Sequence, residues 1–171
     1  MATLKIWSNA ELSEQGRERL RAATAQHELT QVDADSSATA DLGGFDVAFG
    51  QPNAAACAQS DSLRWLAINT AGITRYDTPE FRENFAARGG VFTNMGSAFA
   101  EPCAQHLLAM ILALNRKLPD SWADQQKPSP PWAYNARRNV SDLLTGQTVL
   151  ILSFGKIARR LIELSQPFGL K

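Results

Sequence analysis

The residues best suited to hold a charged ligand form one short run, Ser153-Phe154-Gly155-Lys156-Ile157-Ala158. An apolar run at residues 149–152 precedes them and apolar residues at helical spacing follow, which predicts a strand, a tight turn and a helix. The small residues Ser153, Gly155 and Ala158 fit the fingerprint G-x-G-x-x-G/A. A pyrophosphate could approach the backbone at Gly155 and meet the N–H groups and positive dipole end of the helix.

Ser153 departs from that fingerprint, because glycine ordinarily makes the tight turn at this position. An ordinary strand-helix unit that binds nothing would show the same pattern. The fingerprint alone therefore leaves both interpretations open.

The elements around this run alternate between strand and helix. Five short strands are predicted, with helices between them, at residues 4–7, 28–32, 46–49, 65–68 and 91–94. This alternation predicts an α/β fold with a doubly wound parallel sheet, in which ligands bind beyond the carboxyl ends of the strands. Two such ends contain small or polar residues, namely Ala71-Gly72 and the stretch 94–97.

Composition excludes several classes of function. The 171 residues carry no net charge and the pI is near 6.7, so neither nucleic acid nor an anionic membrane is an expected partner. No apolar run resembles a signal peptide or a membrane span, and a cytoplasmic location is expected. The two cysteines and two histidines lack metal-site spacing, so no metal is expected.

Five segments in order resemble the D-isomer-specific 2-hydroxyacid dehydrogenases over nearly the whole chain. They are A-G-I-x-x-x-D at residues 71–77, G-G-V-x-x-N at 89–94, the helix that begins near Ala100-Glu101-Pro102, L-x-G-x-T-V at 144–149, and P-F-G at 167–169. The resemblance implies a flavodoxin-like substrate domain at residues 1–98, an interdomain helix at 99–118, an aromatic and proline-rich arm at 119–143, and the beginning of an NAD(P)-binding Rossmann domain at 144–171.

The resemblance also implies ligands and residue roles. Backbone amides of Ala71, Gly72 and Ile73 would cradle the carboxylate of a small 2-hydroxy or 2-oxo acid, and Asn94 would lie near the same cleft. Cys103 would line the cofactor cleft beside the nicotinamide-side ribose, and residues 153–158 would hold NAD or NADP. The plainer alternatives are that Gly72 only allows a turn, that Asn94 is a turn residue bonded to its own backbone, and that Cys103 is an inert buried thiol.

The family's catalytic arginine, its acidic residue and its histidine would all lie beyond Lys171. We therefore expect the sequence to be a fragment of a longer oxidoreductase and the 171-residue chain to be inactive alone. The helix at residues 101–118 is apolar on every face, which predicts burial all round; in the family this helix lies beside the partner subunit, so a homodimer is implied. The alternative function is a non-catalytic, truncated or ligand-binding module.

Overall fold

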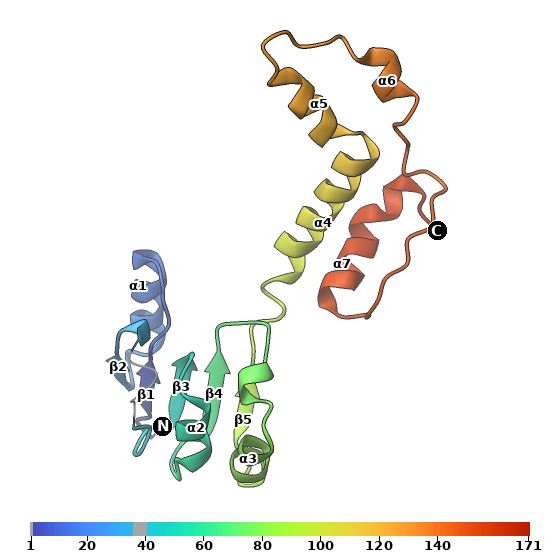
Figure 1. Cartoon of the computed structure of the whole chain (residues 1–171). Helices are drawn as coiled ribbons and strands as arrows, with labels where there is room; N and C mark the ends of the chain where they lie inside the picture. The colour runs from blue at the N-terminus through green and yellow to red at the C-terminus, as the bar shows by residue number, and fades with distance from the viewer. Residues whose placement is uncertain (1, 36–40) are drawn as a thin grey trace. The chain divides into compact units, whose positions relative to one another are not determined.

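The computed structural model describes residues 2–35 and 41–171. The backbone divides into two compact units, Met1–Gly96 and Ser97–Lys171 (Figure 1). Each unit is described by itself below.

The first unit is built on one parallel sheet of five strands. Its strands are β1 (Lys5–Ser8), β2 (Glu28–Gln31), β3 (Val47–Gly50), β4 (Trp65–Ile68) and β5 (Val91–Thr93). Their order in the sheet is β2-β1-β3-β4-β5, and each neighbouring pair is parallel. This is the flavodoxin-like order, so the α/β fold predicted from the alternating elements is confirmed.

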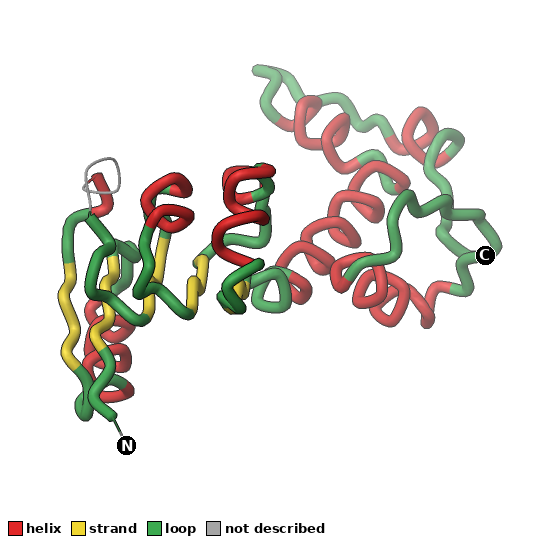
Figure 2. Tube along the Cα trace, turned by 90° about the horizontal axis from the view of Figure 1, so that it is seen from below, coloured by secondary structure: helices red, strands yellow, loops and turns green. Residues whose placement is uncertain are grey.

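Helices cover both faces of this sheet. Figure 2 shows α1 (Glu14–Ala23) on one face and α2 (Ala54–Gln59) and α3 (Pro79–Phe81) on the other. The backbone continues from α3 as a single wider helical turn, Arg82–Ala86. The side chain of Asn53 caps α2 by accepting hydrogen bonds from the N–H groups of Ala55 and Ala56.

An aromatic cluster forms one end of the core. The rings of Tyr76, Phe81, Phe85 and Phe92 lie with centroids 4.9 to 5.7 Å apart. Such ring pairs contribute about 0.5–1.5 kcal/mol each beyond the area they bury. The Tyr76 hydroxyl also donates to the carbonyl of Pro52 over 2.8 Å. Because Tyr76 ends the segment that follows β4, this cluster anchors the loop at residues 69–73.

The second unit is helical. It contains α4 (Ala100–Asn115), α5 (Leu118–Gln125), α6 (Tyr134–Arg138), α7 (Lys156–Ser165) and a 3₁₀ turn at Gln166–Phe168. Helix α4 packs along α7, and Arg160 of α7 pairs with Glu101 of α4. The segment expected as an aromatic arm thus holds α6 and most of α5 (Figure 1).

Two expectations for this unit are wrong. Helix α4 is not buried all round, since Leu107, Met110 and Leu114 are 40%, 49% and 60% exposed. Within this chain α4 packs chiefly on α7 and, near its end, on α5. The predicted strand at residues 149–152 belongs to no sheet, because only the stretch 169–171 pairs beside it among the described residues.

The pairing at this place is nevertheless of parallel type. The N–H of Lys171 donates to the carbonyl of Gln147 over 2.8 Å, and the N–H of Val149 donates to the carbonyl of Lys171 over 2.9 Å. A residue that bonds to the two neighbours of the residue opposite it has the hydrogen-bond pattern of two parallel strands. The two paired segments and helix α7 between them therefore follow one another in the order of a βαβ unit, although neither segment is a strand of a sheet.

Candidate functional site

In the loop after β4, the four carbonyl groups of residues 70–73 each accept a hydrogen bond. The N–H of Met95 donates to the carbonyl of Thr70 over 3.0 Å, and Asn94 Nδ2 donates to that of Ala71 over 2.8 Å. The hydroxyl of Thr70 donates to the carbonyl of Gly72 over 3.0 Å. The last carbonyl, that of Ile73, accepts from the N–H of Tyr76 over 2.8 Å.

Three consecutive N–H groups of the same loop are unoccupied. Among the described residues, those of Ala71, Gly72 and Ile73 donate no hydrogen bond, and all three residues are exposed. A Cβ built on Gly72 would meet nothing within 4 Å, so the space in front of the backbone is open. Three consecutive free N–H groups beside open space can accept an anion such as a carboxylate.

A chain of amide side chains supports this loop from neighbouring strands. Gln51, directly after β3, donates through Nε2 to Asn69 Oδ1 over 2.8 Å and to Thr70 Oγ1 over 3.1 Å. The buried Asn9, directly after β1, accepts the Gln51 N–H over 2.7 Å and returns a bond from Nδ2 to the Gln51 carbonyl over 3.2 Å. Gly50 has φ +123°, and a Cβ there would lie 2.4 Å from Asn9 Oδ1.

Sequence reasoning missed this supporting chain. Asn9, Gln51 and Thr70 were not singled out as site residues, although each follows the end of a strand in a parallel sheet. Polar residues at the carboxyl ends of adjacent strands are the signal that could have found them. The structure also gives Asn94 a definite role, because its side chain donates across the loop to Ala71.

The fingerprint turn lies in the second unit. Ser153 has φ +80°, the left-handed conformation that the usual first glycine adopts without strain. Gly155 is the residue before α7 and has an ordinary φ of −81°, and a Cβ there would meet nothing within 4 Å. No side chain among the described residues caps α7, so its first N–H groups face outward. Ala158 is half-buried.

Basic side chains surround this turn. Lys156 Nζ lies 3.1 Å from Ser97 Oγ, and the guanidinium of Arg159 lies 4.9 Å from the ring centroid of Phe154. Arg160 instead pairs with Glu101, and its hydrogen bond holds the pKa of that carboxyl below the usual value. Among the described residues, Lys156 and Arg159 are therefore the basic side chains next to the turn that form no salt bridge with a carboxylate.

The two cysteines have different environments. Cys57 is fully buried in the core of the first unit, and burial raises the pKa of its thiol to about 12. Cys103 is half-buried on α4 in the second unit, the unit that also holds residues 153–158. The predicted site residues thus fall into two groups, Ala71, Gly72, Ile73 and Asn94 in the first unit and the rest in the second.

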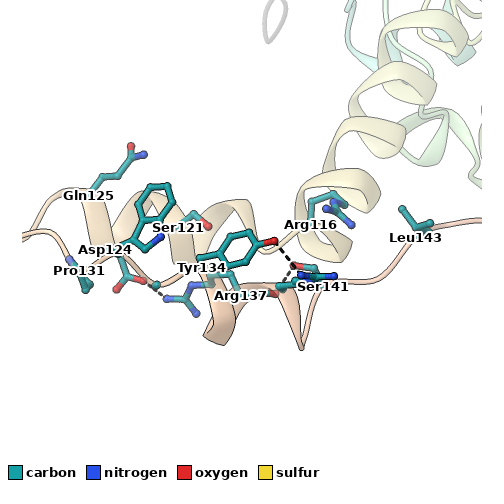
Figure 3. A pocket seen from close by; sticks show the side chains of 12 residues that line it. Arg116, Ser121, Asp124, Gln125, Pro131, Tyr134, Arg137, Ser141 and Leu143 are labelled. Atoms are coloured by element: carbon teal, nitrogen blue, oxygen red, sulfur yellow. Dashed lines mark hydrogen bonds and ion pairs between the residues drawn. The ribbon is translucent and has the colours of Figure 1, made fainter.

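A third feature, which the sequence did not predict as a site, is a hollow of about 690 Å³ in the arm of the second unit. Figure 3 shows Asp124 of α5 facing Arg137 of α6 across it, with Tyr134 alongside. Neither the fingerprint nor the loop after β4 contributes to its lining. The Asp124–Arg137 pair joins the two arm helices, and the Ser141 hydroxyl donates to the Arg137 carbonyl at the end of α6.

Other kinds of site are not found in the described part of the chain. Its histidine, cysteine and acidic residues form no group of three or more suited to a metal ion. None of its helices combines the length and the apolar character that crossing a membrane requires.

Solved structures with the same fold have low sequence identity to this chain. A phosphoglycerate oxidoreductase from Rhizobium etli is 22% identical with a TM-score of 0.67, over 98% of this chain and 53% of that one. Rhodotorula graminis D-mandelate dehydrogenase is 14% identical with a TM-score of 0.78, over 100% and 55%. An acyclic imino acid reductase in complex with NADPH and D-Arg is 16% identical with a TM-score of 0.78, over 98% and 54%.

No protein-family model and no curated protein matches the chain by sequence. The chain spans about half the length of the solved structures that it matches. The resemblance read from five short motifs is thus confirmed at the level of the fold. This chain has the α/β fold that a phosphoglycerate oxidoreductase, a D-mandelate dehydrogenase and an imino acid reductase share with it over about half of their length.

Proposed function

We propose that this chain is part of an NAD(P)-dependent oxidoreductase of the D-isomer-specific 2-hydroxyacid dehydrogenase family. The full-length protein would transfer a hydride between the nicotinamide and C2 of a small D-2-hydroxy or 2-oxo acid. The observation that carries the proposal is the stretch 70–73, in which all four carbonyls accept hydrogen bonds while the N–H groups of Ala71, Gly72 and Ile73 donate none among the described residues. These N–H groups would bind the carboxylate of the acid.

The turn at residues 153–158 would hold the pyrophosphate of the cofactor. The left-handed Ser153, the open space at Gly155 and the uncapped start of α7 fit such a group. Lys156 and Arg159 would add positive charge, and Cys103 would lie beside the ribose. The nicotinamide, when bound, supplies or accepts the hydride, and these residues bind and orient it. Related folds were solved with NADPH and with NAD, and the proposal covers both cofactors.

The domain organisation is part of the proposal. Residues 1–98 would be the substrate domain, 99–118 the interdomain helix, 119–143 the arm and 144–171 the beginning of the Rossmann domain. The two histidines of the sequence, His27 and His106, lie outside both groups of site residues, and His27 accepts from the Leu4 N–H at the opposite edge of the sheet. We therefore expect the 171-residue chain alone to reduce no 2-oxo acid in an NADH-oxidation assay. The free cysteines agree with the proposed cytoplasmic location.

Two matched glycine substitutions test the two halves of the proposal. Gly155→Val and Gly72→Val both place a side chain in open space at an ordinary φ, so neither should unfold the protein. Titration of the purified protein with NADH and with oxamate, an unreactive analogue of a 2-oxo acid, would measure each ligand separately. We expect Gly155→Val to weaken NADH binding at least about tenfold by obstructing the phosphate, and Gly72→Val to do the same for oxamate.

Each variant serves as the control for the other. Gly155→Val should leave oxamate affinity unchanged, and Gly72→Val should leave NADH affinity unchanged. Unaltered NADH binding in Gly155→Val would show that this turn is not the phosphate site. A full-length protein that binds both ligands without turnover would favour the binding-module alternative.

A further inference from the structure

The three free N–H groups share their peptide units with three carbonyls that accept hydrogen bonds, those of Thr70, Ala71 and Gly72. In a trans peptide the N–H of one residue points away from the C=O of the residue before it. The peptide bonds of the described chain are trans. A donor that holds the carbonyl of Thr70, Ala71 or Gly72 therefore fixes the direction of the N–H of the following residue.

Each of the three peptide planes has its own donor. The Met95 N–H holds the Thr70 carbonyl and so aims the N–H of Ala71. Asn94 Nδ2 holds the Ala71 carbonyl and aims the N–H of Gly72. The third donor, the Thr70 hydroxyl, holds the Gly72 carbonyl and aims the N–H of Ile73. Two of these donors are side chains, which substitution can remove while residues 71–73 stay unchanged.

The polarity of the Thr70 hydroxyl is itself fixed by a neighbour. Gln51 Nε2 donates to Thr70 Oγ1 over 3.1 Å, which directs the hydroxyl hydrogen onward to the Gly72 carbonyl. Asn9 holds the backbone of Gln51 through both its N–H and its carbonyl. The hydrogen bonds thus run across the carboxyl ends of β1, β3, β4 and β5, which are adjacent in the sheet.

We infer that Thr70 and Asn94 are positioning residues for anion binding, supported by Gln51 and Asn9, and that each side chain aims one peptide N–H at the substrate carboxylate. This inference rests on the proposed function, since it takes residues 71–73 as the carboxylate site. The donors hold the N–H groups in place before the ligand arrives, so binding does not have to order the loop. Asn94 then acts through Ala71 and Gly72 and need not touch the acid itself.

The test is a titration of the ¹⁵N-labelled 171-residue chain with oxamate, followed by the amide signals of residues 71–73. Thr70→Val removes the hydroxyl with little change of shape and should weaken oxamate binding about fivefold, the worth of one hydrogen bond. The amide whose chemical-shift change on adding oxamate is reduced most should be that of Ile73. Asn94→Ala should weaken binding to a similar degree, with the loss at Gly72. A purely structural role would disturb all three amides alike.

Three controls separate positioning from general damage. Thr70→Ser keeps the hydroxyl and should restore oxamate affinity to within about twofold of wild type. Asn84→Ala removes another exposed asparagine of the same unit and should change nothing. Thermal unfolding of each variant should stay near that of wild type, because Asn94 is exposed and Thr70 is only half-buried.

The outcomes distinguish this inference from the proposed function. No oxamate shift at residues 71–73 in the wild-type chain would refute the carboxylate site and the inference together. Normal wild-type binding that Thr70→Val and Asn94→Ala both leave intact would overturn the inference and keep the site. Residue-specific losses at Ile73 and Gly72, with rescue by Thr70→Ser, would support it.

Discussion

Ser153 takes the left-handed conformation with φ +80°, which a side chain makes costly and which glycine adopts freely. The serine stands where the fingerprint normally has glycine, so the backbone keeps the shape of the motif while the residue departs from it. The pyrophosphate turn is therefore geometrically possible in this sequence, at a cost in conformational strain.

Relief of this strain gives a first prediction. Ser153→Gly should raise the free energy of unfolding by about 0.5–1 kcal/mol, the strain removed less the added freedom of the unfolded chain. Urea unfolding measures this change. Lys117→Gly is the matched control, because Lys117 also has a positive φ, of 54°, before α5. Both substitutions should stabilise, but only Ser153→Gly should alter NADH affinity. A less stable Ser153→Gly would show that the serine side chain makes a compensating contact.

The cysteines give a second prediction at the scale of single residues. Burial raises the pKa of the Cys57 thiol to about 12, so almost no reactive thiolate forms at mildly alkaline pH. Cys103 is half-buried on α4 and should react. In the native protein a disulfide reagent should therefore label the Cys103 thiol quickly and leave that of Cys57 unlabelled. After denaturation it should label both cysteines. Saturating NADH should slow the labelling of Cys103 if the cofactor lies beside it, and Cys103→Ser should abolish the fast phase.

At the scale of elements, the arm depends on one carboxylate. Asp124 of α5 accepts from Lys127 over 2.7 Å and also pairs with Arg137 of α6 (Figure 3). These partners, the Lys127 hydrogen bond first, hold the pKa of Asp124 below its ordinary value of 3.8. A lowered carboxyl pKa means that the stabilisation is fully present above the ordinary pKa and is lost as the pH falls through the folded-state value.

We therefore expect the α5–α6 arm to loosen in acid before the sheet of the first unit does. Hydrogen exchange at about pH 3 and about pH 6 should show the loss of protection in α5 and α6. Asp124→Asn should remove most of this pH dependence and lower the protection of the arm at both pH values. Asp120→Asn is the matched control, since Asp120 lies 3.7 Å from Arg137 and is 54% exposed. Equal effects of the two substitutions would contradict the assignment to Asp124.

Strands in the first unit were predictable because each is a short apolar run that ends at a turn residue. Residues 65–68 match β4 at both ends, and the other four strands match within one or two residues. Residues 149–152 have the same apolar character but form no strand, since a strand depends on its neighbours in space. The arm helices were missed because α5 and α6 lie among prolines and polar residues, where local pattern is weak.

The candidate site was only half predictable for a related reason. Gly72 and Gly155 could be singled out because glycine marks places where the backbone needs open space. The left-handed turn at Ser153 could not be predicted from residue type, because a serine stands where the fingerprint has glycine. The contacts of Asn9, Gln51 and Thr70 join residues up to 42 positions apart in sequence, and only the strand order brings them together.

At the scale of the whole molecule, five exposed apolar residues on α4 and α5 form what we call the apolar stripe. Leu107, Met110, Leu114, Leu118 and Trp122 recur three or four residues apart and are 40% to 66% exposed. A soluble monomer rarely exposes so long an apolar row. This stripe supports the homodimer that the family resemblance implies, with α4 at the interface.

The dimer is a prediction that sedimentation can check. The chain should have about twice its 18.7 kDa mass in solution. Leu114→Glu places a charge at the middle of the stripe and should shift the protein toward monomer by at least about tenfold in dissociation constant. Leu150→Glu is the matched control, because Leu150 is 86% exposed and lies outside the stripe. A wild-type monomer, or equal effects of both substitutions, would count against α4 as the interface.

The loop after β4 would bind its anion with peptide groups. This affects how anion binding depends on pH and which residues of the loop can be substituted. A peptide N–H does not ionise in the range where proteins are stable, so the strength of this binding should not vary between weakly acid and alkaline pH. The side chains at positions 71 and 73 remain free to vary while the main-chain path is kept. A site of this kind can persist while its residues change, and searches by residue identity are poorly suited to detect it.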